Sequence, residues 1–193
     1  MILVISIIIY IFAPRGTPVS SEKWEVLHTI VEDGDIICRL GGRFWSLMFR
    51  DASSLDRRYS HMGIIRIYDD RITVVHAEGD TGHGRDGVNE VPLEDFVTVA
   101  RAIGIYRAKN INREEISTAA LDYLGIPFDW KFDMSDESEI YCTELLYIIL
   151  KRIAPETELH TVFVKEVGKE VIPLEAVSNS PDFIEVYYIK SNR

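Results

Sequence analysis

A cysteine at the start of an apolar helix is the sequence feature that most constrains the fold of this chain. Cys142 follows a segment rich in aromatic and carboxylate residues, and residues 145–150 are all hydrophobic. A thiol at a helix start lies beside unpaired backbone N–H groups and the positive end of the helix dipole, and both favour the nucleophilic thiolate. Most free cysteines are instead small, buried, apolar residues. The position of Cys142 alone leaves both interpretations open.

The composition indicates one globular domain and excludes several kinds of partner. The chain has 193 residues, of which 47% are hydrophobic, and a net charge of -10. It contains no basic run, so we expect no nucleic-acid partner. Two cysteines do not make a disulfide framework, and Cys38 lies in an apolar segment typical of a core strand. The five histidines are dispersed without metal-ligand spacing, so we expect neither a metal site nor a cofactor.

The first nineteen residues are treated apart from the domain, which we place at 20–193. Residues 2–13 are apolar except for Ser6, and Pro14, Gly16 and Pro18 follow them. The apolar run is too short to span a bilayer comfortably but has the length of a signal-peptide core. We therefore expect a signal peptide or short membrane anchor plus linker, and a location in the cell envelope. The alternative is a buried N-terminal strand, since Ile and Val are abundant, and a cytoplasmic protein.

The remaining elements follow from periodicity, caps and turn residues. Helices are predicted near 20–31, 43–49, 112–124 and after 142, and strands near 36–38, 59–68, 72–78, 102–107 and 183–189, with a strand end and a short helix at 91–96. Residues 155–180 are less regular. This order predicts an α+β fold with a mainly antiparallel sheet.

The segment 59–78 predicts a β-hairpin that carries two histidines. A two-residue loop at Asp69-Asp70 would place His61 opposite Glu78 and His76 one diagonal step from His61. Side chains alternate between the two faces of a strand, so His61, His76 and Glu78 would share one face of the sheet. A β-bulge would change this arrangement.

These residues together match the requirements of a thiol hydrolase. Such a site needs an ionisable thiol, an imidazole within hydrogen-bond reach, a group that orients the imidazole and a donor for the oxyanion. Cys142 and its backbone N–H, His61, and either His76 or Glu78 supply these groups. Each histidine taken alone could equally be structural, but the combination favours catalysis.

Four motifs carry a resemblance to a known family. They are Gly34-Asp35-Ile36-Ile37, Tyr59-Ser60-His61-Met62-Gly63, Gly125-Ile126-Pro127-Phe128-Asp129 and Tyr141-Cys142-Thr143-Glu144-Leu145. In this order they resemble the YiiX/YebB-like proteins, a circularly permuted branch of the NlpC-type, papain-like cysteine hydrolases. The resemblance covers about 33–153, with a weaker echo at 171–174.

The resemblance implies a circularly permuted papain-like (NlpC-type) fold, in which a mainly antiparallel sheet packs against the cysteine-bearing helix. It implies Cys142 as nucleophile, His61 as general base and His76 as the third member, with Glu78 as the alternative. The expected activity is hydrolysis of an amide or ester acyl bond in a small peptide, such as a cell-wall peptide, or in a lipid-like substrate. A non-catalytic lipid- or peptide-binding module and an acyltransferase are the alternatives. The oligomeric state is not predicted.

Three residues near the cysteine are candidates for substrate binding. Tyr141 either packs or donates a hydrogen bond to substrate, and Asp129 either caps a loop or binds a substrate amine. Trp130 either lines an apolar acyl pocket or belongs to the core. Glu144 is expected to complement the helix N-terminus and to point away from the thiol.

Overall fold

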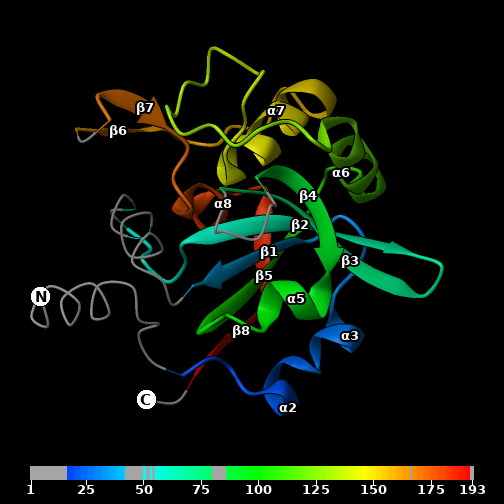
Figure 1. Ribbon diagram of the computed structural model, residues 1–193. Coiled ribbons are helices and arrows are strands. Elements are labelled where there is room, and N and C mark those ends of the chain that lie inside the picture. Colours follow the sequence, from blue (N-terminus) through cyan, green and yellow to red (C-terminus); the bar gives the residue numbers. More distant parts are fainter. Residues whose placement is uncertain are drawn as a thin grey trace, which may run out of the picture.

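The computed structural model describes residues 17–41, 50, 53, 55–79, 86–165 and 167–191. A six-stranded sheet runs through its centre in the order β4-β3-β2-β1-β5-β8, and every neighbouring pair is antiparallel (Figure 1). The strands are β1 (Ile36–Leu40), β2 (His61–Tyr68), β3 (Arg71–Glu78), β4 (Gly87–Pro92), β5 (Ala102–Ala108) and β8 (Phe183–Lys190). The α+β class with a mainly antiparallel sheet is thereby confirmed.

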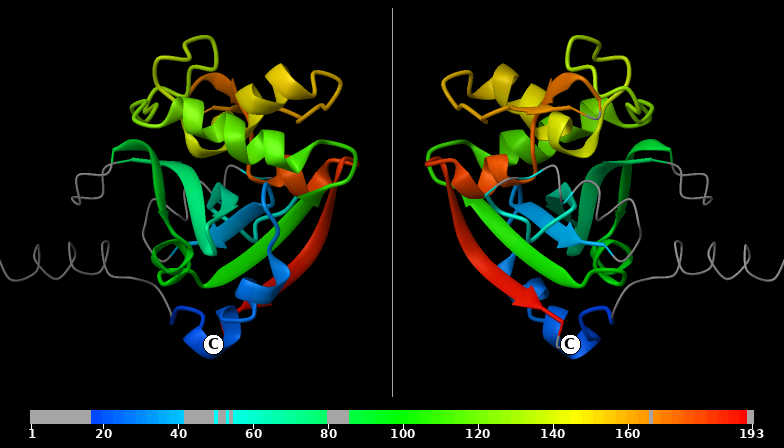
Figure 2. Two further views of the ribbon diagram at one scale, coloured as in Figure 1. Left: turned by 90° about the vertical axis from the view of Figure 1, so that its right-hand side faces the viewer. Right: turned by 90° about the vertical axis from the view of Figure 1, so that its left-hand side faces the viewer.

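Helices cover both faces of this sheet (Figure 2). One face carries α6 (Arg113–Ala120), the 3-10 helix η1 (Leu121–Tyr123) and α7 (Cys142–Ile153), and the other carries α3 (Leu27–Ile30) and α5 (Leu93–Val97). The short helices α2 (Ser21–Trp24) and α8 (Glu175–Asn179) and a small hairpin, β6 (Val162–Val164) with β7 (Lys169–Val171), complete the described elements.

Strand alternation separates two hydrophobic cores. Cys38 and Met62 face the core that contains α7, whereas Ile37 and Ile65 face the core that contains Phe96 of α5. Cys38 is fully buried, as expected of a core residue. The central strands β1 and β2 are therefore apolar on both faces, and a polar side chain on them requires a partner.

The predicted hairpin is confirmed in its turn and in its register from Ile64 to Tyr68, but the pairing of β2 with β3 ends before His61 and Glu78. Tyr68 pairs with Arg71 and Ile64 pairs with Val75. The two loop residues, Asp69 and Asp70, both have positive φ, at 48° and 58°. Positive φ at both central residues is the geometry that matches the right-handed twist of the flanking strands.

Several predicted elements differ in detail. The helix expected near 20–31 is divided into α2 and α3, and the segment 155–180 contains β6, β7 and α8. Asn112 precedes α6, but its side chain bonds the Glu115 carboxylate at 2.9 Å instead of a backbone N–H. The helix predicted at 43–49 and the apolar run at 2–13 lie outside the described residues. Within the described ranges, no helix has the length and apolarity needed to span a membrane.

A buried carboxylate joins the start of β1 to β5. Asp35 is fully buried, and its two oxygens accept hydrogen bonds from Arg107 Nε at 2.9 Å and Nη2 at 2.8 Å. The backbone N–H of Glu32 also donates to Asp35, at 2.8 Å. The aspartate of the Gly34-Asp35 motif is thus an anchor of the sheet, because its removal would leave a partly buried guanidinium without its bidentate partner.

We predict that Asp35→Ala lowers the free energy of unfolding by about 3 kcal/mol, the lower end of the range for removing one partner of a buried ion pair. Asp122→Ala is the matched control, because its ion pair with Arg152, at 2.9 Å, is solvent-exposed, and it should change the free energy by less than about 0.5 kcal/mol. Urea unfolding followed by circular dichroism measures both. Equal losses in the two variants would contradict the anchoring role.

Candidate active site

The backbone of Ile172 fixes the first turn of α7. Tyr141 is the N-cap, and its hydroxyl oxygen accepts a hydrogen bond from the Ile172 N–H at 3.0 Å. The Thr143 hydroxyl donates to the Ile172 carbonyl oxygen at 2.6 Å. Cys142 lies between these two anchored residues, so the direction of its side chain is set from both sides.

Glu144 completes the start of the helix. Its Oε2 accepts a hydrogen bond from the Tyr141 N–H at 3.2 Å, which confirms the helix-capping role and directs the carboxyl back over the cap residue. Burial raises the pKa of this carboxyl to about 7. The negative charge of the neighbouring Asp129 also raises it, whereas the hydrogen bond from the Tyr141 N–H lowers it. Glu144 is therefore largely uncharged below that pH, which limits its repulsion of a thiolate at Cys142.

The Cys142 thiol is buried and protonated at neutral pH. Burial raises its pKa to about 11, although the backbone N–H groups of Met62, Thr143 and Cys142 and the charge of Arg39 all favour the thiolate. The helix start favours a thiolate but does not by itself produce one in the resting protein. Loss of hydration outweighs the helix N-terminus here.

A gap between two strands brings the thiol to the sheet. The paired register of β2 with β3 begins at Ile64. The Ile65 N–H donates to the Asp35 carbonyl oxygen at 2.8 Å and so points toward β1. Backbone N–H groups of successive residues in a strand point to opposite sides, so the Met62 N–H points toward the β3 side. The Met62 N–H favours a negative charge on the Cys142 sulfur. The thiol therefore meets the sheet one residue from His61, but from the α7 side, whereas His61 and His76 pack on Phe96 on the α5 side.

The two predicted histidines lie on either side of this gap and contact each other. His61 Nε2 is 2.9 Å from His76 Nδ1, and which nitrogen donates depends on the tautomer. The rings are nearly perpendicular, at 86°. A side chain at Gly63 would crowd this site, because its Cβ would lie 3.1 Å from His76 Cβ and 2.4 Å from Val74 Cγ1. The glycine of the Ser-His-Met-Gly segment thus makes room for the imidazole pair.

His61 is held uncharged. Burial lowers its pKa well below the usual 6.5, and the charge of Arg39 and the neighbouring His76 act in the same direction. A neutral imidazole whose Nε2 is occupied by His76 has Nδ1 left to exchange a proton. Within the described parts of the chain, no hydrogen bond joins the Cys142 thiol to either imidazole, so proton transfer requires a side-chain movement at the gap.

The alternative third member has a different partner. Glu78 Oε1 accepts a hydrogen bond from Arg39 Nη2 at 2.8 Å. The geometry thus brings His76 to His61 and brings Glu78 to Arg39.

The three substrate-binding candidates are placed differently. The Tyr141 hydroxyl is engaged by Ile172, and Asp129 is buried and accepts a hydrogen bond from the Lys131 N–H at 2.7 Å. Both contacts match the structural alternatives, packing and loop capping. Trp130 is 52% exposed, and its ring lies 2.3 Å from where a Cβ on Gly79 would be. Trp130 therefore lies over the end of β3, next to Glu78.

Two residues at the imidazole pair escaped the sequence analysis. Phe96 of α5 contacts His61 and His76, with centroid distances of 5.6 and 5.2 Å. The Arg39 guanidinium lies 4.3 Å from the centre of the same ring. A charged residue in the otherwise apolar strand Ile36–Leu40 was the available signal for Arg39. Phe96 gave no signal, because an aromatic residue in a short amphipathic helix is ordinary.

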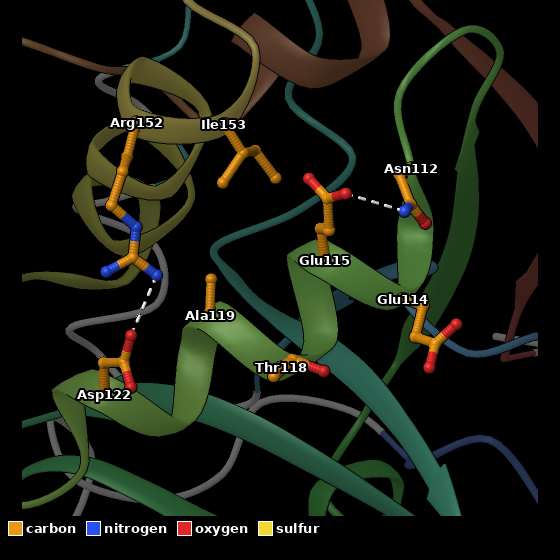
Figure 3. Close-up of a pocket in the computed structure, with 8 residues that line it drawn as sticks. All are labelled: Asn112, Glu114, Glu115, Thr118, Ala119, Asp122, Arg152 and Ile153. Atoms are coloured by element: carbon orange, nitrogen blue, oxygen red, sulfur yellow. Dashed lines mark hydrogen bonds and ion pairs between the residues drawn. The ribbon is translucent and has the colours of Figure 1, made fainter.

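A hollow between α6 and α7 lies away from these groups (Figure 3). Its lining includes Arg152, which pairs with Asp122 at 2.9 Å, and Ile153. These residues are at the last turn of α7, about 15 Å along the helix from Cys142. The hollow is therefore separate from the thiol and the imidazole pair.

Comparison with known proteins identifies the family. A family model described as permuted papain-like amidase enzyme, YaeF/YiiX, C92 family, matches residues 31–190. No curated protein sequence matches the chain. Among solved structures, the metalloprotein YiiX from Escherichia coli O157:H7 superposes with a TM-score of 0.69 at 17% identity, over 84% of this chain and 99% of that one.

The description as a metalloprotein applies to YiiX. In the described part of this chain, no group of three or more His, Cys, Asp or Glu side chains is arranged to hold a metal ion. The family match extends over most of the chain and includes every residue of the candidate site. The chain therefore belongs to the permuted papain-like amidase family of YaeF and YiiX, and has the fold and the peptidase- or amidase-like character of that family.

Proposed function

We propose that this protein is a thiol hydrolase that cleaves an amide or ester acyl bond, with Cys142 as nucleophile, His61 as general base and His76 as the group that orients His61. One observation carries the proposal. The His61–His76 pair, joined at 2.9 Å, lies next in the chain to Met62, whose N–H favours a thiolate at Cys142. Family membership supports the same class of activity.

The reaction begins from two neutral groups. As the Cys142 sulfur attacks the acyl carbon, His61 accepts the thiol proton, and His76 stabilises the resulting imidazolium through its hydrogen bond. His61 then donates this proton to the departing amine or alcohol, which leaves a thioester on Cys142. Water attacks the thioester while His61 accepts one of its protons, and the proton returns to the sulfur as the acid is released.

The backbone supplies the oxyanion donor. Cys142 is the first residue of α7, so its N–H has no partner within the helix and lies beside the reacting carbon. A donor of this kind stabilises the charge that develops on the acyl oxygen. The Ile172 contacts of Tyr141 and Thr143 support this role, because they hold the turn that carries the N–H.

The proposed substrates are small peptides, such as cell-wall peptides, or lipid-like acyl compounds. The exposed Trp130, at the end of β3, offers an apolar surface for the substrate beside the site. An acyltransferase would use the same residues with an acceptor other than water. A binding module would not need two imidazoles in contact, and this favours an enzyme.

We predict that Cys142→Ala and His61→Gln each lower kcat/KM at least about 10³-fold, because members of one catalytic unit are required together. The matched control is His28→Gln, which removes a surface histidine paired with Glu94 at 3.2 Å and should change kcat/KM by less than about twofold. The assay measures release of products from a peptide amide and an acyl ester, and intact-mass spectrometry detects the acyl adduct on Cys142.

The same assay separates the alternatives. Product that appears only when an added amine or alcohol is present identifies an acyltransferase. Saturable binding without turnover, unchanged in Cys142→Ala, identifies a binding module. Full hydrolysis by folded Cys142→Ala contradicts the proposal.

The pH dependence has a defined sign. His61 works as a base only when unprotonated, and its pKa is well below the usual 6.5. We therefore predict that kcat/KM stays level through pH 6.5 and falls only in more acidic solution, whereas an unperturbed histidine would halve the activity near pH 6.5. Initial rates between about pH 4 and 9 measure the profile. A half-maximal rate at pH 6.5 or above would show that the imidazole is not held neutral.

A further inference from the structure

We propose that Arg39 is a positioning residue for the Cys142–His61 pair. Its buried guanidinium fixes the aromatic ring on which both imidazoles pack, and it supplies the positive charge toward which the thiolate develops. The role of Arg39 in catalysis rests on the proposed function. Its effects on the protonation of His61 and on the reactivity of Cys142 are measurable without turnover.

Arg39 is held in one place by three elements of the fold. It lies on β1 directly opposite His61 of β2, and it is 7% exposed. Its Nη1 donates to the Phe96 carbonyl oxygen at 2.7 Å, and its Nη2 donates to Glu78 Oε1 at 2.8 Å. A guanidinium bonded to both α5 and β3 from β1 has little freedom to reorient.

The ring of Phe96 transmits this placement to the histidines. The guanidinium stacks on the ring at 4.3 Å, and the same ring is nearly parallel to His61, at 27°, and perpendicular to His76, at 82°. Because Arg39 bonds the Phe96 backbone and also packs on its side chain, it fixes the surface against which both imidazoles rest.

The charge of Arg39 acts on both reacting groups. It disfavours a proton on His61 and favours a thiolate at Cys142, so the pKa of each group is lowered by the same cation. After attack, the same charge makes the His61 imidazolium a stronger acid toward the leaving group. Glu78 offsets part of this charge through its ion pair with Arg39.

Most of the other charged groups around the pair are acidic. Among the described residues, the titratable groups on the packed elements include Cys38 on β1, His76 and Glu78 on β3, Glu94 and Asp95 on α5, and Glu144 on α7. Of these groups, His76 is the one that can gain a positive charge, and it does so only when protonated. Within the described part of the site, Arg39 is therefore the permanent cation.

The test compares Arg39→Gln, Arg39→Lys and Glu78→Gln with a matched control, Arg66→Gln. Arg66 also lies on the sheet, pairs with a glutamate at 3.1 Å and stacks on an aromatic ring at 3.9 Å, but it is at the other end of β2. The readouts are the NMR titration of the His61 ring protons, assigned with His61→Gln, and the rate of iodoacetamide alkylation at Cys142, mapped by mass spectrometry.

The expected results have opposite signs in two variants. Arg39→Gln should raise the titration midpoint of His61 by about one pH unit, and Glu78→Gln should lower it. Arg39→Gln should also slow alkylation about threefold, because a tenfold loss of thiolate is partly offset by its greater nucleophilicity. Arg39→Lys should restore both values, and Arg66→Gln should leave them unchanged.

Several outcomes would overturn the inference. Shifts of the same sign in Arg39→Gln and Glu78→Gln would indicate a general structural effect, as would equal shifts in Arg66→Gln. If Arg39→Gln fails to fold, the downward shift in Glu78→Gln and the retained values in Arg39→Lys still decide the matter. If the titrations follow the prediction but the protein hydrolyses no amide or ester, the positioning role of Arg39 stands and the proposed function is refuted.

Discussion

The attachment of the first turn of α7 to the backbone of Ile172 is the constraint on which the site depends. Tyr141 and Thr143 use both polar groups of one residue, its N–H and its carbonyl oxygen. These bonds are buried, so losing either would leave an unsatisfied polar group as well as a loosened helix. The direction of the Cys142 sulfur, the place of its N–H and its approach to β2 all follow from this attachment.

Burial, more than local charge, decides the protonation state of the site. Helix N–H groups and a nearby cation both favour a thiolate, yet the loss of hydration leaves the Cys142 thiol with a pKa of about 11. The same loss keeps His61 neutral. In the resting site the thiol and the His61 imidazole therefore carry no charge, although Arg39 and Glu78 form an ion pair beside the imidazoles.

Periodicity and turn residues predicted the helices and hairpins, which depend on neighbouring residues in the sequence. The hairpin of His61 and His76 follows from strand periodicity and a two-residue turn, and the helix of Cys142 follows from its apolar spacing. The Arg39–Phe96 and Tyr141–Ile172 contacts join residues 57 and 31 positions apart, and no periodicity specifies such pairs. For the same reason, the sequence could not show that His76 contacts His61 whereas Glu78 bonds Arg39. The thiol pKa could not be derived from the helix start, because desolvation is a property of the packed molecule.

The order of the segments along the chain has a consequence for biosynthesis. Met62 contributes the N–H at the thiol, Cys142 follows 80 positions later, and Ile172 follows after another 30. Contacts between such distant segments form only after long loops have closed. A nascent chain therefore carries a thiol but no organised site until nearly all of the domain has left the ribosome. The thiol and the imidazole pair reach their final places as one of the last events of folding, so the organised site is a property of the finished molecule.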